Sequence, residues 1–427
     1  MIVKAGLLVD LGNSETRVVV LSGKYAYSFN MSNVFAQLPG GYRVPKSYGN
    51  DKSTIFEING IYFANGLIVE REFAGSGMRP SALQSKASQL VTDLSLSLAV
   101  IKSMNILARA YNLLPSNLDV TFNVSVLLPP LDHEVNEEQM IERVRNLRPV
   151  STLIPTPMQY NFKIGEVGVY SEAVAALFGA FFKEEGIREL PESMIEPFLR
   201  EGVTVRDNGE HLQLVEVEEN RKFATGYTLV LDIGAGTTDV ALFKDMELVE
   251  RSKETFKRGG NTVASIVLNE IKKKFGFTPS DLSRVISTGI LDEGDYKHDV
   301  SDIVTMAKEI YSKQTQMDLI PYLERMSLDM PVVKGLLVAG GGSLPSVRKV
   351  AWVEQTEQGV QYGPEVTEAE IRAGAEYKEV VVSPAMSDVL VGFLKELAPR
   401  IEVLNTQGKD LRRLNIEGLV YLHKYMA

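Results

Sequence analysis

Several residue types that mark particular classes of protein are missing or scarce in this sequence. It contains no cysteine, which excludes disulfides and thiolate metal sites and suits a reducing compartment. Its four histidines are scattered, so a histidine-rich metal centre is not expected. No uninterrupted apolar run approaches the ~18 residues of a membrane-spanning helix. The acidic Asp10 comes too early for a secretory signal sequence, and we therefore expect a cytoplasmic protein.

Positive charge is also in short supply. Lysine and arginine total 45 against 55 aspartate and glutamate residues, which gives a formal net charge of −10. The field of the whole molecule therefore repels a phosphate backbone. The densest basic run is Lys272-Lys273-Lys274, which we interpret as the solvated face of a helix. We expect neither direct nucleic-acid binding nor a membrane partner.

The remaining composition is that of an ordinary globular protein. Apolar residues make up 44% of the chain and charged residues 23%. A length of 427 residues suits two or three domains. The sequence has no GxxxxGK[ST] run, so a P-loop nucleotide site is excluded.

The most informative feature is a repeated strand–turn–strand unit. Residues 6–21 consist of two β-branched, apolar runs around a turn rich in Gly, Asn and Ser, a pattern that predicts a hairpin of buried strands. Residues 9–20, VDLGNSETRVVV, align without gaps with residues 231–242, LDIGAGTTDVAL. Each copy has an aspartate at the end of its first strand and a glycine two residues later. The repeat predicts two related halves.

The two turns have the chemistry of an anion site. Glycine-rich turns let consecutive backbone N–H groups converge on a phosphate. Asp10 and Asp232 would repel a phosphate directly, but they suit Mg²⁺ held through water. Either aspartate alone reads more simply as a turn residue. Two copies favour a polyphosphate held from both sides, with the metal between the carboxylates.

Two more segments contribute to this interpretation. Residues 338–345, VAGGGSLP, are a strand that runs into three glycines, which is either a plain strand-to-helix turn or a place where a flat ring lies on the backbone. Residues 170–179 begin a helix, with Ser171 as its expected N-cap and Glu172 in its first turn. A carboxylate at that position could also orient water for attack on a phosphate.

The rest of the chain shows ordinary helix and strand patterns. An acidic segment at 186–226 has no dominant period, and we interpret it as a connector with an exposed hairpin at about 203–217. The other expected elements are a hairpin at 56–63, helices at 82–114, 134–147 and 171–185, and strands at 120–128, 159–169 and 334–339.

The order of these motifs resembles that of the actin, hexokinase and DnaK-type chaperone superfamily. DLGNSETR at 10–17 and DIGAGTTD at 232–239 resemble its two phosphate motifs, and VAGGGSLP at 338–345 resembles its adenosine motif. SEAVAALFG at 171–179 and AEIRAGAEYK at 369–378 resemble the two connecting helices. The resemblance spans nearly the whole chain.

This resemblance implies an α/β fold, the duplicated actin-like fold of two βββαβα-type halves around a nucleotide cleft. It also implies ATP and Mg²⁺ as ligands. The implied domains are domain I at 1–185 plus 376–427, with a small strand-rich subdomain IB at 31–81, a connector at 186–226, and domain II at 227–375, with subdomain IIB at about 262–330.

The resemblance further assigns roles to individual residues. Asp10 and Asp232 would organise magnesium and its waters, and Glu172 would orient the attacking water. Arg17 stands where actins have a phosphate-contacting lysine. The implied phosphate donors are Gly12, Asn13, Ser14, Gly234, Ala235, Gly236 and Thr237; the implied nucleoside contacts are Lys308, Glu309, Gly340, Gly341, Gly342 and Ser343.

Within the superfamily, the chain most resembles bacterial ParM-like filament proteins of plasmid segregation. The grounds are its length, the short insertion at about 30–80 and the Asp-x-Gly-Asn sequence of the first turn. The resemblance implies an ATP-hydrolysing protein that forms head-to-tail polymers and segregates plasmid DNA through a centromere-binding adaptor protein.

Three alternatives remain open within the superfamily. A small-molecule kinase would share the fold, but no sugar-site motif is present. A chaperone would need a peptide-binding domain, and too few residues follow the glycine triplet for one. A cell-shape or division actin could use residues 418–427 as a membrane anchor, although packing on the first half suits this short tail better.

Overall fold

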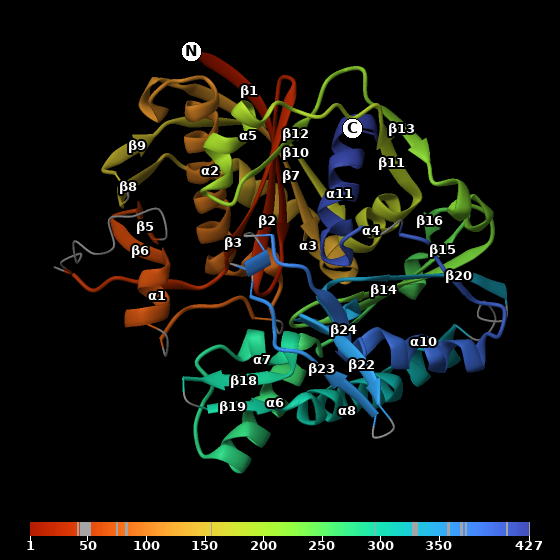
Figure 1. Ribbon diagram of the computed structural model, residues 1–427. Helices are drawn as coiled ribbons and strands as arrows, with labels where there is room; N and C mark the ends of the chain where they lie inside the picture. The colour runs from red at the N-terminus through yellow and green to blue at the C-terminus, as the bar shows by residue number, and fades with distance from the viewer. Residues whose placement is uncertain are drawn as a thin grey trace.

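Each half of the protein is built around a mixed β-sheet, as the computed structural model in Figure 1 shows. The structure describes residues 1–40, 42, 53–73, 76–81, 84–154, 156–294, 296–326, 332–356, 359–367, 370–371, 374–406 and 409–426. The first sheet contains, in order, β10 (Phe162–Ser171), β7 (Asp119–Leu128), β1 (Ile2–Leu11), β2 (Glu15–Ser22), β3 (Tyr25–Ser32) and β12 (Thr204–Asp207). The second contains β16 (Glu247–Leu248), β15 (Thr238–Lys244), β14 (Tyr227–Ile233), β20 (Val333–Ala339) and β25 (Glu402–Val403), with β17 (Glu254–Phe256) also paired to β15.

The two sheets repeat one topology. In the first, β1, β2 and β3 are antiparallel, and β7 and β10 continue in parallel on the other side of β1. In the second, β14, β15 and β16 take the antiparallel places, and β20 and β25 take the parallel ones. The predicted duplicated α/β fold and both predicted strand–turn–strand units are therefore confirmed.

The central strands explain the continuous apolar runs of the sequence. Leu7, Leu8 and Val9 are fully buried although consecutive side chains of a strand point to opposite faces. Both faces of the sheet must therefore be covered, as is usual where parallel strands form its centre. The predicted strands at 120–128 and 334–339 are β7 and β20.

Helices cover both sheets and fill the space between them. They are α1 (Leu67–Glu72), α2 (Leu90–Ala110), α3 (Pro130–Arg145), α4 (Glu172–Phe181), α5 (Glu192–Leu199), α6 (Gly260–Phe275), α7 (Leu282–Thr288), α8 (Ser301–Arg325), α10 (Met386–Leu397) and α11 (Leu414–Tyr421). α2 and α3 share a core with the first sheet, and α6, α8 and α10 share one with the second. α4 and α11 contribute to cores on both sheets and so join the halves.

The contact between α4 and α11 depends on two glycines. A Cβ atom on Gly418 would lie 1.7 Å from the carbonyl oxygen of Ala175, and one on Gly179 would lie 2.3 Å from that of Leu414. The two backbones therefore touch, which a larger residue would prevent. The C-terminal segment lies on the first half, as predicted, because its apolar side chains pack against β1, β2 and β7.

A third, smaller sheet forms from the predicted strand-rich segment 31–81 and a later hairpin. Its strands, in order, are β4 (Phe35–Gln37), β6 (Ile61–Gly66), β5 (Ser53–Ile58), β8 (Val150–Ile154) and β9 (Met158–Tyr160). The predicted hairpin at 56–63 is confirmed, because β5 and β6 pair across the turn between Ile58 and Ile61. Residues 41, 43–52 and 74–75 of this segment lie outside the described residues.

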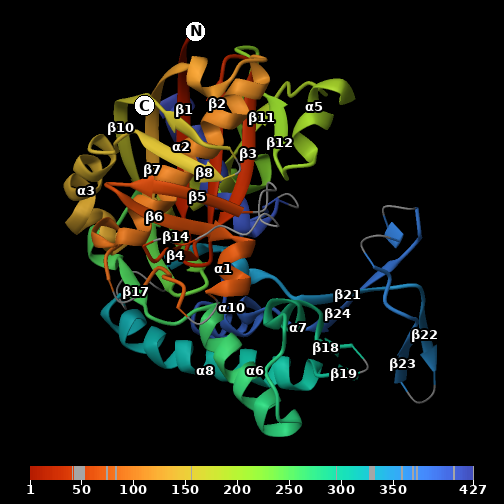
Figure 2. The ribbon, with the colours of Figure 1, turned by 90° about the vertical axis from the view of Figure 1, so that its left-hand side faces the viewer.

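Within the described residues, four two-stranded sheets complete the fold. They are β11 (Phe182–Glu185) with β13 (Gln213–Glu216), β18 (Ile290–Glu293) with β19 (Tyr296–Asp299), β21 (Ser346–Val350) with β24 (Lys378–Ser383), and β22 (Val353–Thr356) with β23 (Gly359–Tyr362). Figure 2 shows the β22–β23 hairpin standing away from the rest of the second half.

Some expectations about local structure are wrong. Residues 203–217 do not form one hairpin, because β12 pairs with β3 and β13 pairs with β11. The helix expected at 171–185 ends at Phe181, where β11 begins. The connecting helix expected at 369–378 is shorter than that: Glu370 and Ile371 are helical, residues 374–377 are not, and Lys378 begins β24; residues 369, 372 and 373 lie outside the described residues. A helix that joins the halves has to be apolar, and α11 meets that need where the charged segment 369–378 does not.

The packing of α10, β25 and the connector favours domain limits that differ from the expected ones. α10 and β25 belong to the second half, although 376–427 was expected in domain I. We propose that the chain returns to the first half near residue 410. Phe198 and Val205, within the connector 186–226, lie in the first core, so we assign that part of the connector to domain I.

One helix among the described residues, α2, is long and apolar enough to cross a membrane by length and composition. Its most apolar window is 78% buried inside the protein. This burial is what the core helix of a globular domain shows. α2 begins at Leu90 rather than near residue 82, because a short helix, η2 (Lys86–Ser88), precedes it and is capped by Ser85.

Candidate functional site

A cleft of about 920 Å³ lies between the two halves. The turn between β1 and β2, the turn between β14 and β15, the N-terminus of α4 and the glycine triplet after β20 all reach it, so the sheet topology brings the predicted motifs together. The predicted site residues that line it are Asp10, Gly12, Asn13, Ser14, Arg17, Glu172, Asp232, Gly234, Ala235, Thr237, Lys308, Gly340, Gly341 and Gly342. Gly236 and Glu309 are not among its lining residues; Ser343 ends a short helix, η7 (Gly341–Ser343), and its side chain lies outside the described part of the chain.

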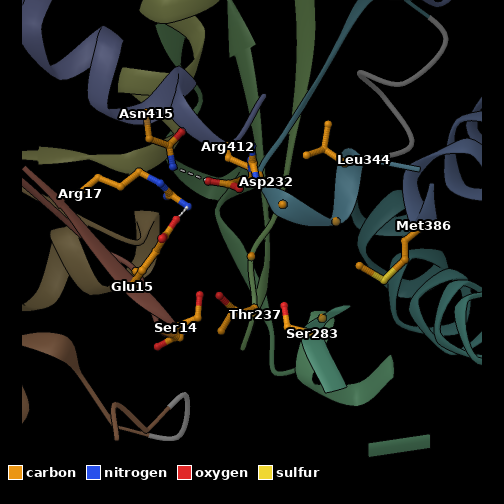
Figure 3. Close-up of a pocket in the computed structure, with 18 of the residues that line it drawn as sticks. Ser14, Glu15, Arg17, Asp232, Thr237, Ser283, Leu344, Met386, Arg412 and Asn415 are labelled. Atoms are coloured by element: carbon orange, nitrogen blue, oxygen red, sulfur yellow. Dashed lines mark hydrogen bonds and ion pairs between the residues drawn. The ribbon is translucent and has the colours of Figure 1, made fainter. Parts of the chain in front are cut away.

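The first turn is tight and carries an ion-pair network. The Gly12 N–H donates to the Asp10 carbonyl at 3.1 Å, and a Cβ on Gly12 would lie 2.6 Å from the Glu15 carbonyl oxygen. The Arg17 guanidinium contacts the Asp10 carboxylate at 3.1 Å and the Glu15 carboxylate at 2.8 Å. Arg17 is thus held at the edge of the cleft by two acids, as Figure 3 shows for Glu15. The predicted phosphate contact would have to compete with these pairs.

The second turn is held from behind by the start of α6. The carbonyls of Gly234 and Ala235 accept hydrogen bonds from Gly260 at 3.0 Å and Asn261 at 2.7 Å. Within a trans peptide unit the N–H points away from the C=O. The amides that follow these two carbonyls therefore face away from α6, which leaves them available to an anion in the cleft.

Four buried carboxylates face the same cleft. Asp10, Asp232, Asp239 and Glu172 are between 2% and 6% exposed. Burial raises the pKa of Glu172 to about 8; the charges of Asp239, Asp10 and Asp232 add to this rise, and Lys86 opposes it. The side chains of the cleft therefore create a surplus of negative potential.

Lys86 provides the cluster with a cation. Its Nζ lies 2.5 Å from Glu172 Oε1, and its side chain is 11% exposed. Burial works to lower the pKa of Lys86, but the carboxylates of Glu172, Asp10 and Asp239 outweigh it, so the pKa is raised overall. Lys86 is therefore a permanent positive charge beside the expected water-orienting residue.

The other two carboxylates are fixed by neutral donors. Asp239 accepts from Thr255 Oγ1 at 2.5 Å and from Thr237 Oγ1 at 3.1 Å. Burial nevertheless raises the pKa of Asp239 to about 6. Asp232 accepts from Asn415 Nδ2 at 2.7 Å, an interaction drawn in Figure 3. Burial also raises the pKa of Asp232, and Asn415 opposes that rise.

These residues fit a magnesium ion that is held through water. Among the described residues, no group of three or more His, Cys, Asp or Glu side chains could hold a metal directly. Burial raises the pKa of Asp232, so a cation beside its carboxylate would stabilise the ionised form. Magnesium keeps several of its waters in proteins, so separated carboxylates can still hold it. Asn415 Oδ1 is buried without a partner in the described structure, and could accept from such a water.

Two glycines of the triplet allow close packing against β14, and the third has open space around it. Gly340 has φ +82°, and a Cβ there would lie 2.4 Å from Asp232 Oδ1. A Cβ on Gly342 would lie 2.2 Å from the side chain of Ile233. These two glycines let the turn pack against β14, whereas a Cβ on Gly341 would have no neighbour closer than 3.8 Å. Apolar side chains continue the cleft here, among them Leu344 and Met386, which Figure 3 shows on the side opposite Arg17.

Lys308 lines this end of the cleft but is already hydrogen-bonded. Its Nζ donates to Ser346 Oγ at 2.8 Å and to the Pro384 carbonyl at 2.9 Å. Burial lowers the pKa of Lys308 to about 8, although the charge of Asp388 opposes this. The ribose contact stays a prediction, and these bonds hold β21 and the start of α10 to α8.

Sequence reasoning missed several residues of the site. Asp239 ends the motif DIGAGTTD and aligns with Arg17 in the repeat, which could have pointed to it. Lys86 and Asn415 lie in no recognisable motif, because only the fold brings η2 and α11 to the cleft. Ser171 is at the N-cap position of α4, but the expected side-chain capping bond is absent.

Two related sheets around a cleft lined by paired turns define an actin-like fold, and comparisons with known proteins agree. Residues 230–349 match the family model described as archaeal actin homologue MreB-like, C-terminal. Comparison of the sequence with curated proteins found no match. The resemblance to the actin-like superfamily and the predicted fold class are confirmed.

The particular relatives are solved structures of low sequence identity. Ta0583, an archaeal actin homologue, is 15% identical, with a TM-score of 0.59 and coverage of 100% of both chains. Bacillus thuringiensis ParM with ATP is 15% identical, with a TM-score of 0.57 and coverage of 99% of this chain and 100% of that one. The same ParM with AMPPNP is 16% identical, with a TM-score of 0.56 and coverage of 98% and 97%. This protein has the fold that they share.

Proposed function

We propose that this protein is a filament-forming ATPase that hydrolyses ATP with Mg²⁺ in the cleft between its halves. The supporting observation is that two equivalent turns face one cleft with four buried carboxylates around them. That ParM was solved with ATP in the same fold supports the choice of nucleotide.

In this proposal the two turns bind the phosphates, and the carboxylates of Asp10 and Asp232 hold the metal. The backbone N–H groups of residues 13–14 and 235–237 donate to phosphate oxygens, whereas those of Gly12 and Gly234 are already bonded within the turns, to the carbonyls of Asp10 and Thr237. Lys86 and Arg17 offset phosphate charge from the first half. When bound, Mg²⁺ would supply further charge neutralisation, and Asp10 and Asp232 would hold it through water.

Glu172 orients and accepts a proton from the attacking water. Its pKa of about 8 places it close to the range in which a general base works best at neutral pH. Lys86, at 2.5 Å, fixes the direction of the carboxylate and favours its ionised form. This short contact supports a joint function of the pair in positioning water.

Assembly would follow from closure of the cleft. Surfaces contributed by both halves align when the halves close on nucleotide, and head-to-tail contacts between identical subunits then give an open polymer. Each such contact would bury at least about 1,000 Å². We propose that the polymer moves plasmid DNA in the cytoplasm through a basic, centromere-binding adaptor, since the net charge of −10 disfavours direct DNA contact.

The test combines turnover with light scattering. Wild-type protein should hydrolyse ATP only with magnesium, and should scatter light above a critical concentration after a lag. Asp232→Ala should lose magnesium-dependent hydrolysis. Unchanged turnover in this variant would exclude the cleft as the metal site. A flat scattering trace, with turnover that rises when small alcohols or carboxylates are added, would instead indicate a small-molecule kinase.

A further inference from the structure

Asn33 is a buried side chain behind the first turn, at the junction of β3 and β4, and is only 2% exposed. Its Nδ2 donates to the carbonyl oxygen of Gly12, and its backbone N–H donates to that of Ser14 at 3.3 Å. Its Oδ1 accepts from Thr16 Oγ1 at 2.5 Å and from Ser95 Oγ at 2.9 Å. One residue thus holds two carbonyls of the turn and is itself fixed by β2 and α2.

The bond to Gly12 sets the direction of the next backbone amide. The carbonyl of Gly12 and the N–H of Asn13 belong to one trans peptide unit, in which they point in opposite directions. Because Asn33 holds the carbonyl from behind, the Asn13 N–H faces the cleft that Asn13 lines. Glycine has the widest backbone freedom of any residue, so this orientation depends on an external contact.

The chemistry of the asparagine is specific to this task. A carbonyl oxygen can only accept a hydrogen bond, so the group facing Gly12 has to be the NH₂. The two hydroxyls of Thr16 and Ser95 then donate to the amide oxygen. An aspartate of the same shape would keep those two bonds, but it would place an oxygen against the Gly12 carbonyl.

A second buried asparagine links this segment to the small sheet. Asn65, on β6, is 3% exposed, and its Nδ2 donates to the carbonyls of Ser32 at 2.8 Å and Val34 at 3.0 Å. These two residues flank Asn33. The segment 32–34 is therefore clamped between the small sheet on one side and the first turn on the other.

We propose that Asn33 is a positioning residue that aims the Asn13 amide at the nucleotide phosphates, and that Asn65 couples the small sheet to this amide. The inference rests on the proposed nucleotide site. It predicts that loss of the Asn33 donor weakens binding of the phosphates and spares binding of the nucleoside.

The test compares dissociation constants for ATP and for adenosine by equilibrium titration. Asn33→Asp should weaken ATP binding by about tenfold or more, the scale of a lost hydrogen bond to a charged ligand, and change adenosine binding less than about twofold. Asn220→Asp is the matched control, because Asn220 is fully buried and its Nδ2 also donates to backbone carbonyls, those of Ala180 and Asn405, outside the cleft. It should leave the ratio of the two constants unchanged.

Each outcome decides the inference. If Asn33→Asp weakens ATP and adenosine binding in parallel, or weakens neither, Asn33 does not position the phosphate turn. If Asn33→Asp does not fold, Ser95→Ala replaces it, because it keeps the Gly12 bond and loosens the Asn33 side chain. That variant should lower ATP affinity about threefold and leave adenosine affinity unchanged. An ATP affinity equal to that of the wild type would overturn the inference. Absence of ATP binding by the wild type would overturn the proposed function itself.

Discussion

Replacing Lys86 with methionine should destabilise the protein by an amount that grows with pH. Lys86 Nζ lies 2.5 Å from Glu172 Oε1, and both side chains are buried, so the substitution removes the counter-ion of a buried carboxyl. Breaking such a pair costs about 3–5 kcal/mol when the remaining group stays charged. Glu172 need not stay charged, because its pKa is already raised from 4.5 to about 8.

The magnitude follows from the protonation of Glu172. An acid whose pKa is raised on folding makes the protein lose stability as pH rises from the unfolded pKa to the folded one. In the wild type this loss stops near pH 8. In Lys86→Met it continues, because the lysine that held the pKa of Glu172 down is gone. Through Glu172, the free energies of unfolding of the wild type and Lys86→Met should differ by about 1 kcal/mol below pH 8, the value of a hydrogen bond. Above pH 8 this difference should grow by about 1.4 kcal/mol per pH unit.

Urea unfolding of both proteins without nucleotide, at pH 6, 7, 8 and 9, measures this difference. Glu172→Gln and the double variant provide the control. With glutamine at 172, the effect of removing Lys86 should lose its growth above pH 8 and keep only the part from Asp239 and Asp232, whose pKa values Lys86 also lowers. A difference that stays constant from pH 6 to pH 9, or that shrinks, would refute the conclusion that the two groups titrate as a pair.

Three further predictions concern the contact between α4 and α11, ATP hydrolysis and DNA binding. Gly418→Ala should destabilise the protein by about 3 kcal/mol or more in thermal unfolding, because its Cβ would meet the Ala175 carbonyl at 1.7 Å. Gly392→Ala, in α10 with open space around it, should stabilise by up to about 1 kcal/mol, and equal effects at both glycines would contradict the backbone contact. Glu172→Ala should slow ATP hydrolysis about a hundredfold and retain ATP binding; loss of binding would make Glu172 structural. The purified protein should not shift plasmid DNA at physiological salt, and tight, salt-sensitive binding to naked duplex would contradict an indirect link to DNA.

Local patterns in the sequence predicted most of the elements that carry the site. The apolar runs on either side of residues 12–14 and 234–237 have to be buried, and a run that is apolar at consecutive positions suits a central strand. The hairpin expected at 203–217 was wrong because a local pattern does not identify the strand with which another strand pairs. The alternating pattern around 203–217 is compatible with a hairpin, but β12 and β13 pair with strands far away in the chain.

The connecting helices show the same limit. Small residues marked both 171–179 and 369–378, yet composition does not say which helix another will touch. In the tertiary structure the helix that packs on α4 is α11. Gly418 and Gly179 allow the two backbones to meet, and the apolar side chains of α11 are buried against both sheets.

The sequence alone determined the repeat, and with it the two sheets, the paired turns and the aspartates Asp10 and Asp232 at their ends. These features are local, since a strand, a turn and the residue that ends a strand depend on neighbours in the chain. The tertiary structure decided which side chains share the cleft. Lys86 reaches Glu172, and Asn415 reaches Asp232, across long stretches of chain. Their effects on pKa depend on burial and distance, and both quantities exist only once the chain has folded.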